Sequence, residues 1–471
     1  MLVNNIFYFV NRYFNYLFSV PSALILMLLF SLAIGFATFI ENDYGTTAAR
    51  AVVFNAWWLE LCLFLLCSIF IFNVFKYKLY FVRKLPILFL HLSFICIIIG
   101  AGITRYIGTE GVMRIREGGL SNQFISSNLF LEFKIHDNEY EYNGKKELLL
   151  SSISNNFFSI PVNFENYRIH VEYQDFIHDP IDRIVLNSVN GSRVLEFIVP
   201  AQNGGMDSKY LAYNDIQDIN NLSVSYNNNT IDSELKVFEK DSVFYFTCIY
   251  DVEYMKMSDQ SKGILTSNQT HILNHKTLYT INGKNIVFKN AFKNASLTQV
   301  PSGVKNNQAQ LDLLRIKLIV SEKDTIIDLY GNSGLISSKE YFNFNNLFFS
   351  FSYGPINHTL PFAISLKDFQ LDRYPGSESP SSFASDIQVI DGNNTFDYRI
   401  FMNNVLNYRG YRFFQSSYDS DEKGTILSVN QDKWGTLVTY FGYLSLLLSV
   451  LSLMVSRFSR INLLSKKINN I

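Results

Sequence analysis

The 471-residue sequence lacks most of the patterns that mark a catalytic or redox site. It has four cysteines and no C-x-x-C motif, which excludes a dithiol reductant of the thioredoxin type, and without C-x-x-C-H it is not a c-type cytochrome. No phosphate loop, nucleophile elbow or zinc-protease helix is present, so nothing in the sequence indicates a hydrolase. The net charge is −1, and the lack of a basic excess argues against nucleic acid as a partner.

Long apolar runs, by contrast, are prominent. Hydrophobic residues make up 48% of the chain and charged residues 17%, and the two are unevenly distributed. Four runs each have about the 20 residues that a helix needs to cross a bilayer. They lie at about 20–40, 52–75, 85–103 and 436–455. The sequence therefore predicts a polytopic α-helical membrane protein with four transmembrane helices, preceded by a cytoplasmic or interfacial segment at 1–19 and followed by a cytoplasmic tail at 456–471.

Basic residues indicate how these helices are oriented. Positive clusters follow the second and fourth runs, whereas the short loop after the first run is net negative. Because positive clusters stay on the cytoplasmic side, both termini are predicted to be cytoplasmic. Residues 104–435 are then predicted to face the periplasm from a cell inner membrane.

The region 104–435 is predicted to form a large β-rich, β-sandwich-like domain. Alternating or β-prone runs recur through it, at Phe130–Ile135, Arg168–Tyr173, Val243–Tyr254, Asn285–Phe288, Leu313–Val320 and Leu347–Tyr353. Asn143-Gly144 and Asn282-Gly283 are predicted to form hairpin turns. Cys248 is the one cysteine of this region, so the domain has no internal disulfide to form.

The third apolar run contains one histidine, His91, and no aspartate, glutamate, lysine or arginine. Lys84 precedes the run and Arg105 follows it, so both charges can reach the membrane surfaces while His91 stays about 10 Å inside. A neutral imidazole in lipid has an N–H and a lone pair that need a partner helix, a water-filled cavity or a metal. Two interpretations are open: an interhelical hydrogen bond, or an axial ligand to heme iron.

Trp57 and Trp58 lie near the start of the second run and are predicted to mark the outer membrane interface, where indole rings prefer to lie. Glu60 follows about one turn inside them. A shallow interfacial carboxylate and a functional group are equally compatible with that position.

Four stretches towards the two ends of the chain carry a family resemblance. They are ATFIEND (Ala37–Asp43), GAGITRYIGTEGVMRIREG (Gly100–Gly118), LPFAISLKDFQLDRYPGSESPSSFASDIQV (Leu360–Val389) and MNNVLNYRGYRFFQSSYDSDEKGTILSVNQD (Met402–Asp432). With four spans, a large outer region before the last span and a histidine in the third, the chain resembles the ResB (CcsB) family of cytochrome c biogenesis proteins. Residues 121–344 match only as a generic β-rich insert. One departure is Asp432-Lys433-Trp434-Gly435, where the family tends to have Asp-Pro-Gly.

The resemblance implies a part in the system II cytochrome c synthase, which exports heme and attaches it covalently to apocytochrome c. It implies that His91 is an axial ligand of heme b, and Arg83 and Lys84 are candidates for propionate contacts by proximity alone. The implied partners are a tryptophan-rich membrane protein of the ResC (CcsA) type, apocytochrome c and a thioredoxin-like reductant of the ResA type. Since this chain has three tryptophans and no such motif, the tryptophan-rich partner is expected to be a separate chain. No catalytic residue is implied.

Two alternatives remain from the sequence. The chain could be a membrane-anchored β-rich scaffold or sensor without heme, in which His91 bonds another helix. It could also carry protons or cations past His91 and Glu60, although two isolated groups in four spans make a poor relay.

Overall fold

The computed structural model describes residues 15–137, 139–187, 191–201, 204–228, 233–304 and 310–455. Most of the predicted N-terminal segment, residues 1–14, and the predicted tail at 456–471 lie outside these ranges. The chain divides into two compact units. Unit 1 comprises Met1–His178 and Val304–Ile471, and unit 2 comprises Asp179–Gly303.

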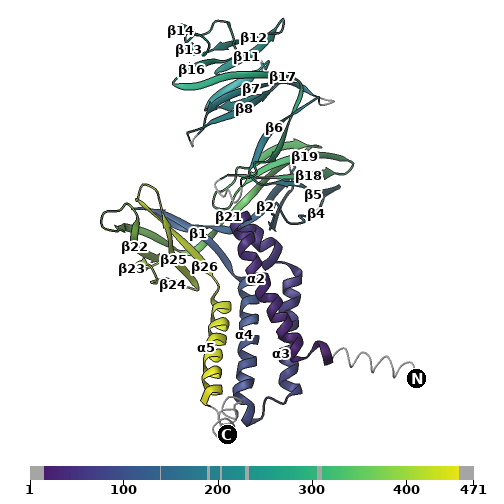
Figure 1. The fold of residues 1–471 in the computed structure, drawn as a ribbon, viewed down its shortest axis with the longest axis vertical. Helices are drawn as coiled ribbons and strands as arrows, with labels where there is room; N and C mark the ends of the chain where they lie inside the picture. The colour runs from purple at the N-terminus through teal and green to yellow at the C-terminus, as the bar shows by residue number, and fades with distance from the viewer. Residues whose placement is uncertain are drawn as a thin grey trace, which may run out of the picture. The chain divides into compact units, whose positions relative to one another are not determined.

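Four helices of unit 1 are long and apolar enough to cross a membrane, which confirms the prediction of four helices with this capacity (Figure 1). They are α2 (Val20–Ala49), α3 (Trp57–Lys76), α4 (Leu85–Ile107) and α5 (Lys433–Val455). A π-helical turn, η1 (Arg50–Phe54), follows α2, and a 3₁₀ turn, η2 (Val82–Lys84), precedes α4.

The first helix extends further than the sequence predicts. It begins where the Ser19 hydroxyl accepts a hydrogen bond from the Ser22 backbone N–H. The polar residues after Ile40 remain helical, and the helix is interrupted only at Gly45, whose φ of 84° is open to glycine. Residues 50–54 then complete this first segment, so the next helix begins at Trp57 rather than at 52.

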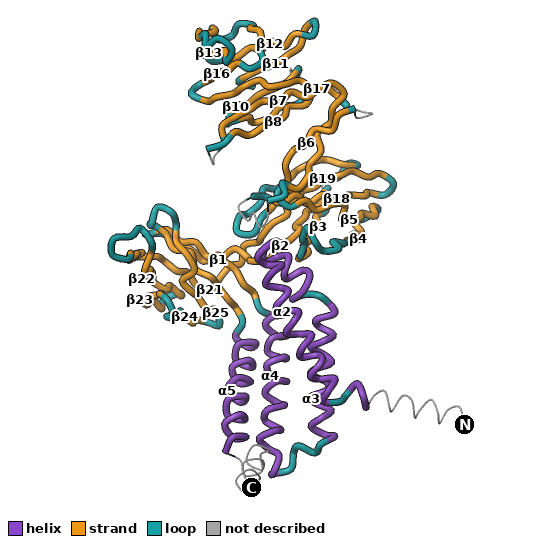
Figure 2. The backbone as a smooth tube through the Cα atoms, viewed as in Figure 1, coloured by secondary structure: helices purple, strands orange, loops and turns teal. Residues whose placement is uncertain are grey.

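The strands of unit 1 form two sheets, which account for part of the large β-rich region (Figure 2). The ten-stranded sheet has the order β23-β22-β21-β2-β1-β26-β25-β24, with β20 on β21 and β3 on β2. Its strands are β1 (Thr109–Arg116), β2 (Leu120–His136), β3 (Glu141–Leu148), β20 (Glu340–Phe344), β21 (Leu347–Arg373), β22 (Pro380–Asp391), β23 (Asn394–Phe401), β24 (Leu406–Tyr408), β25 (Tyr411–Tyr418) and β26 (Gly424–Gln431). The four-stranded sheet comprises β19 (Lys323–Gly331), β18 (Asp312–Val320), β5 (Tyr167–Ile177) and β4 (Ser159–Phe164), in that order.

Two hydrophobic cores stabilise these sheets. One lies between the four-stranded sheet and the β2-β3-β21 part of the larger sheet, and includes Phe133, Ile316 and Phe351. The other gathers side chains from β1, β2 and β21 to β26, including Met113 and Phe413. Because β2 and β21 contribute to both cores, they join them into one unit.

Unit 2 contains the other two sheets, packed around a core of its own. The seven-stranded sheet comprises β6 (Pro180–Leu186), β7 (Ser192–Pro200), β8 (Met206–Ala212), β13 (Val252–Lys256), β14 (Lys262–Leu265), β16 (Thr277–Ile281) and β17 (Lys284–Pro301). The five-stranded sheet comprises β9 (Ile216–Ile219), β10 (Leu222–Tyr226), β11 (Leu235–Lys240), β12 (Val243–Cys248) and β15 (His271–Ile272). The β-rich region predicted as one domain therefore holds an inserted second unit.

The two predicted hairpin turns differ in outcome. Asn282-Gly283 joins β16 to β17 with φ values of 46° and 75°, which confirms the prediction. Asn143-Gly144 instead lies inside β3, where Gly144 pairs with Phe133, so that prediction is wrong. A Cβ on Gly144 would lie 2.1 Å from the Phe133 ring, so this glycine makes room for an aromatic side chain rather than a turn.

Candidate functional site

The candidate site is centred on α4, which forms because its sequence is apolar almost throughout and begins with a proline in its first turn. Pro86 has no N–H to leave unsatisfied at the helix start. The helix ends at Gly108, whose extended backbone leads directly into β1. His91 is therefore held on a regular helix rather than on a loop.

The His91 ring is oriented by its own helix. Its Nδ1 lies 2.9 Å from the carbonyl oxygen of Ile87, one turn earlier. The ring meets Phe70 of α3 edge-on, with centroids 5.6 Å apart, and Phe70 stacks on Phe94 at 5.5 Å. The side chain is half-buried, and Nε2 has no hydrogen-bond partner among the described residues. The hydrogen bond seen for His91 thus lies within α4, and the interhelical bond considered from the sequence is not formed within this part of the chain.

Glu60 belongs to a separate cluster near the other end of α4. Its carboxylate pairs with Arg105 and accepts a hydrogen bond from the Tyr106 hydroxyl at 3.0 Å. Arg105 also donates to the backbone oxygens of Phe54 and Asn55, both at 3.2 Å. Arg105 therefore joins α4 to the start of α3, and this pairing favours a structural role for Glu60.

Trp57 and Trp58 are the first two residues of α3, one turn or less from that cluster. Trp57 is exposed, and Trp58 is also open on the helix surface. The assignment of these rings to the outer membrane interface stays a prediction.

Arg83 and Lys84 lie in η2, eight and seven residues before His91, which is roughly 10–12 Å along a helix axis. The Lys84 ammonium donates to the backbone oxygen of Tyr77 at 2.7 Å. This bond closes the turn between α3 and α4. The propionate contacts expected of both residues remain predictions.

The other side of α4 packs closely against α5 through glycines on both helices. A Cβ on Gly100 would lie 2.9 Å from the backbone nitrogen of Thr439, and a Cβ on Gly442 would lie 3.1 Å from that of Ile97. Gly102, two residues further along α4, has nothing within 4 Å of its Cβ position. Gly100 therefore makes the close contact on α4, and Gly102 does not.

A polar contact at the end of this helix pair was missed in the sequence. The Thr104 hydroxyl donates to the Asp432 carboxylate at 2.5 Å, and the same carboxylate accepts from the backbone N–H of Gly435 at 3.0 Å. Asp432 thus caps the start of α5 and also joins α5 to α4 through Thr104. An Asp three residues before Gly435 is a recognisable cap signal, but its partner 328 residues away is not.

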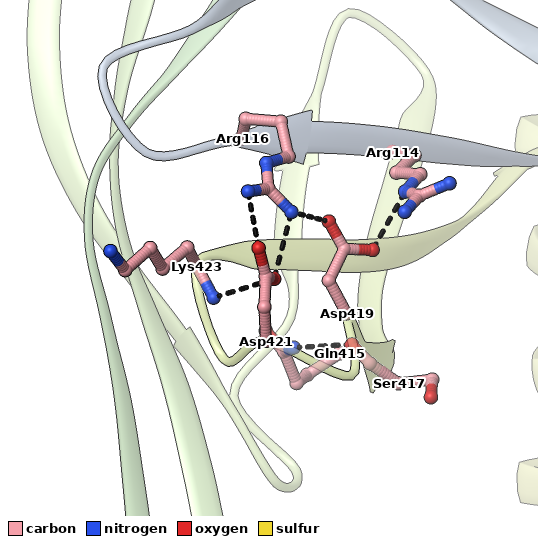
Figure 3. Close-up of polar contacts among 7 residues, drawn as sticks. All are labelled: Arg114, Arg116, Gln415, Ser417, Asp419, Asp421 and Lys423. Atoms are coloured by element: carbon pink, nitrogen blue, oxygen red, sulfur yellow. Dashed lines mark hydrogen bonds and ion pairs between the residues drawn. The ribbon is translucent and has the colours of Figure 1, made fainter. Parts of the chain in front are cut away.

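The strands that continue these helices are also paired. β1 and β26 form an antiparallel ladder from Thr109 opposite Gln431 to Arg116 opposite Gly424. At the far end of this ladder, buried Asp419 accepts from Arg114 Nε at 2.6 Å and from Arg116 at 2.9 Å (Figure 3). Arg116 also bonds Asp421 and lowers the pKa of that carboxyl. Figure 3 shows Arg116 in contact with both carboxylates and Arg114 in contact with that of Asp419.

Comparisons with known proteins point to one family. The ResB-like family model matches residues 326–452, a region that includes β20 to β26 and most of α5. The chain is 28% identical to Protein NrfI of Wolinella succinogenes over 451 residues, which is 94% of this chain and 35% of that protein. This chain therefore spans about a third of the length of that relative.

Among solved structures, the crystal structure of MucB in complex with MucA(peri) covers 52% of this chain and 91% of its own, at 10% identity. The TM-score is 0.09, so no shared fold follows from this match.

Proposed function

With the resemblance to the ResB family confirmed by these matches, we propose that the chain is the heme-handling subunit of a cytochrome c synthase. It takes part in heme export and in the covalent attachment of heme to apocytochrome c. The family match supports the cytochrome c biogenesis role, and the four apolar helices support a membrane location. Both termini are proposed to be cytoplasmic and the β-rich part periplasmic, from the distribution of basic residues.

The observation that carries the proposal is the geometry of His91. Histidines that bind metals usually donate their second ring N–H to a carboxylate or a backbone carbonyl. The 2.9 Å contact between Nδ1 and the Ile87 oxygen meets this requirement. With the proton on Nδ1, the lone pair is on Nε2, the atom that an iron needs. The residues present therefore fit an axial ligand of heme b.

Heme supplies an iron that takes strong axial ligands and two vinyl groups to which the apocytochrome thiols add. This chain holds the ring of His91 in one orientation through Ile87 and Phe70. A single histidine provides one axial ligand, so the second is proposed to come from the tryptophan-rich ResC (CcsA) type partner at a helix interface. Because His91 is only half-buried, its surface is accessible to such a helix.

The positively charged residues near the start of α4 are suited to anionic groups. Arg83 and Lys84 are proposed to contact the heme propionates, since they lie about two turns before His91. The Lys84 bond to Tyr77 keeps this ammonium at the helix start. A propionate beside these two residues is stabilised by their positive charge and does not have to enter the apolar part of the bilayer.

The β-rich part is proposed to receive apocytochrome c by strand addition at a sheet edge, for example at β4 or β19, which end the four-stranded sheet.

Thioether formation needs both apocytochrome thiols reduced. The described cysteines, Cys62, Cys67, Cys96 and Cys248, are unpaired with one another. A thioredoxin-like reductant of the ResA type is therefore proposed as a further partner.

The proton or cation pathway is less well supported by the geometry. Glu60 is paired with Arg105, fourteen residues after His91, which is roughly 21 Å along α4. That separation is too long for proton transfer without further groups between them. The scaffold or sensor without heme is the alternative that an experiment must distinguish from the heme-handling function.

The test is the reduced-minus-oxidised optical spectrum of this chain purified with its tryptophan-rich partner. The wild type is expected to show low-spin Soret and α bands, and His91→Ala is expected to lose them and to regain them with added imidazole. His136→Ala is the matched control, because His136 stacks on Phe348 in the β region and is expected to leave the spectrum unchanged.

Two results would count against the proposal. If wild type and His91→Ala carry the same heme, His91 is not a ligand. If neither carries heme while both insert into the membrane, the scaffold alternative is favoured.

A further inference from the structure

A second site lies in unit 1, away from His91. It is a cavity of about 350 Å³ between the last turns of the α2 segment and the strands that follow α4. Its lining combines apolar side chains such as Leu129 and Phe176 with Arg50, Asp312 and Tyr353. This volume falls within the range of small-molecule sites. The mixed lining suits a ligand with one polar and one apolar part.

Tyr353 lines this cavity and has an unmet hydrogen-bonding group. The residue is 1% exposed, and its hydroxyl has no partner among the described residues. Burial, together with the nearby Asp312 carboxylate, raises the pKa of Tyr353, so the group stays a neutral donor. A buried hydroxyl without a partner costs stability, and a bound acceptor would remove that cost.

The charged groups of the cavity favour a negative ligand. Asp312 accepts from His178 Nδ1 at 2.6 Å, so its charge is engaged within the protein. Arg50, in contrast, forms no ion pair or side-chain hydrogen bond within the described ranges. A guanidinium offers up to five donors and binds carboxylates and phosphates in preference to neutral groups.

The length of α2 places this cavity at the level of lipid headgroups. From Val20 to Tyr44 the helix rises roughly 36 Å, whereas the hydrocarbon core of a bilayer is about 30 Å thick. Tyr44 and the residues up to Arg50 that line the cavity therefore lie beyond the apolar slab.

We propose that this cavity is a binding site for the phosphate group of an anionic membrane lipid, held by Arg50 and the Tyr353 hydroxyl. The apolar part of the lining packs against the glycerol and the first carbons of the chains. The cavity does not include His91, so this proposal is tested independently of the heme proposal.

The experiment measures lipid retained by the full chain after extraction from nanodiscs of phosphatidylcholine with one-fifth phosphatidylglycerol, by native mass spectrometry. The wild type is expected to retain phosphatidylglycerol in preference to phosphatidylcholine. Tyr353→Phe keeps the ring and removes the donor, and is expected to reduce retention about tenfold, the value of one hydrogen bond to a charged group. Arg50→Gln is expected to abolish the preference.

Tyr341→Phe and Arg183→Gln are the matched controls, since neither residue lines the cavity, and both are expected to behave as the wild type. Competition by inorganic phosphate or glycerol 3-phosphate at equal affinity would support the oxyanion site but assign it to a soluble ligand. Equal retention of both lipids, or retention unaffected by Tyr353→Phe and Arg50→Gln, would overturn the proposal. The proposal would also be overturned if the wild type retained no phosphate compound and water alone bonded the Tyr353 hydroxyl.

Discussion

Gly100 and Gly102 give a matched test of how α4 packs on α5. A Cβ on Gly100 would lie 2.2 Å from the Thr439 hydroxyl oxygen, 2.9 Å from its backbone nitrogen and 3.1 Å from its Cα. The hydroxyl can rotate away, but the backbone atoms cannot. Since carbon atoms in contact prefer roughly 3.5–4.0 Å, Gly100→Ala must separate the helices by roughly 0.5–1 Å.

The expected magnitude follows from two opposing effects. Overpacking of a tight contact costs about 1–3 kcal/mol, whereas replacing a helical glycine by alanine gains up to about 1 kcal/mol. Gly100→Ala is therefore expected to destabilise the chain by up to about 2 kcal/mol. Gly102→Ala meets nothing within 4 Å and is expected to be neutral or stabilising.

The assay is thermal unfolding of the two variants and the wild type in the same detergent. The double variant Gly100→Ala with Thr439→Ala removes the hydroxyl but leaves the backbone contacts, so it is expected to recover only part of the loss. If the two single variants unfold at the same temperature, the close contact between α4 and α5 is not formed, and the packing argument is refuted.

Two further predictions concern the β-rich part. Arg116 bonds Asp421 and lowers its pKa, so the unfolded chain takes up the proton first as the pH falls. The stabilisation by this ion pair is full above about pH 4, the usual carboxyl range, and is lost below it. Asp421→Asn is therefore expected to make the unfolding temperature depend less on pH between pH 5 and 3. An unchanged dependence of the unfolding temperature on pH would contradict this. Gly144→Ala places a methyl group against the Phe133 ring and is expected to destabilise unit 1 by about 1–3 kcal/mol in thermal unfolding, whereas exposed Asn143→Ala should change it by less than about 0.5 kcal/mol. Equal effects of these two substitutions would show that the ring does not cover Gly144.

The number and approximate place of the apolar helices were predictable because hydrophobicity alone determines them. Their ends were not, because they depend on single residues: Gly45 interrupts the first helix where the polar residues before it do not. The strand runs were likewise found from alternation, although the run Val243–Tyr254 forms two strands, β12 and β13, with a turn between them.

The two Asn-Gly pairs explain why local turn signals have limited reach. Both have the composition of a type I′ turn, and Asn282-Gly283 forms one. At Gly144 the deciding factor is Phe133 on the neighbouring strand, whose ring occupies the space of a side chain. The local turn signal at Asn143-Gly144 is overridden by a contact with a residue on another strand.

The candidate site divides in the same way. His91 was found because it is the one histidine in the four apolar runs. The pairing of Glu60 with Arg105 joins residues 45 positions apart, and that of Thr104 with Asp432 joins residues 328 apart. No spacing in the sequence relates such residues, so their partners emerge only from the fold. The cavity at Arg50 and Tyr353 is of this kind too, since the two residues come from distant segments.

The connections of α4 and α5 link the His91 helix to the β-rich part of unit 1. One residue, Gly108, separates α4 from β1, and one residue, Asp432, separates β26 from α5. The helices are held at Gly100, and their strands are held along the whole β1–β26 ladder, with Asp432 bonding Thr104 at the junction. A shift of α4 relative to α5 would therefore break backbone hydrogen bonds as well as helix packing. Since both breaks are costly, the two helices and their strands are expected to move as one body, so a partner that binds this sheet experiences any displacement of the His91 helix directly.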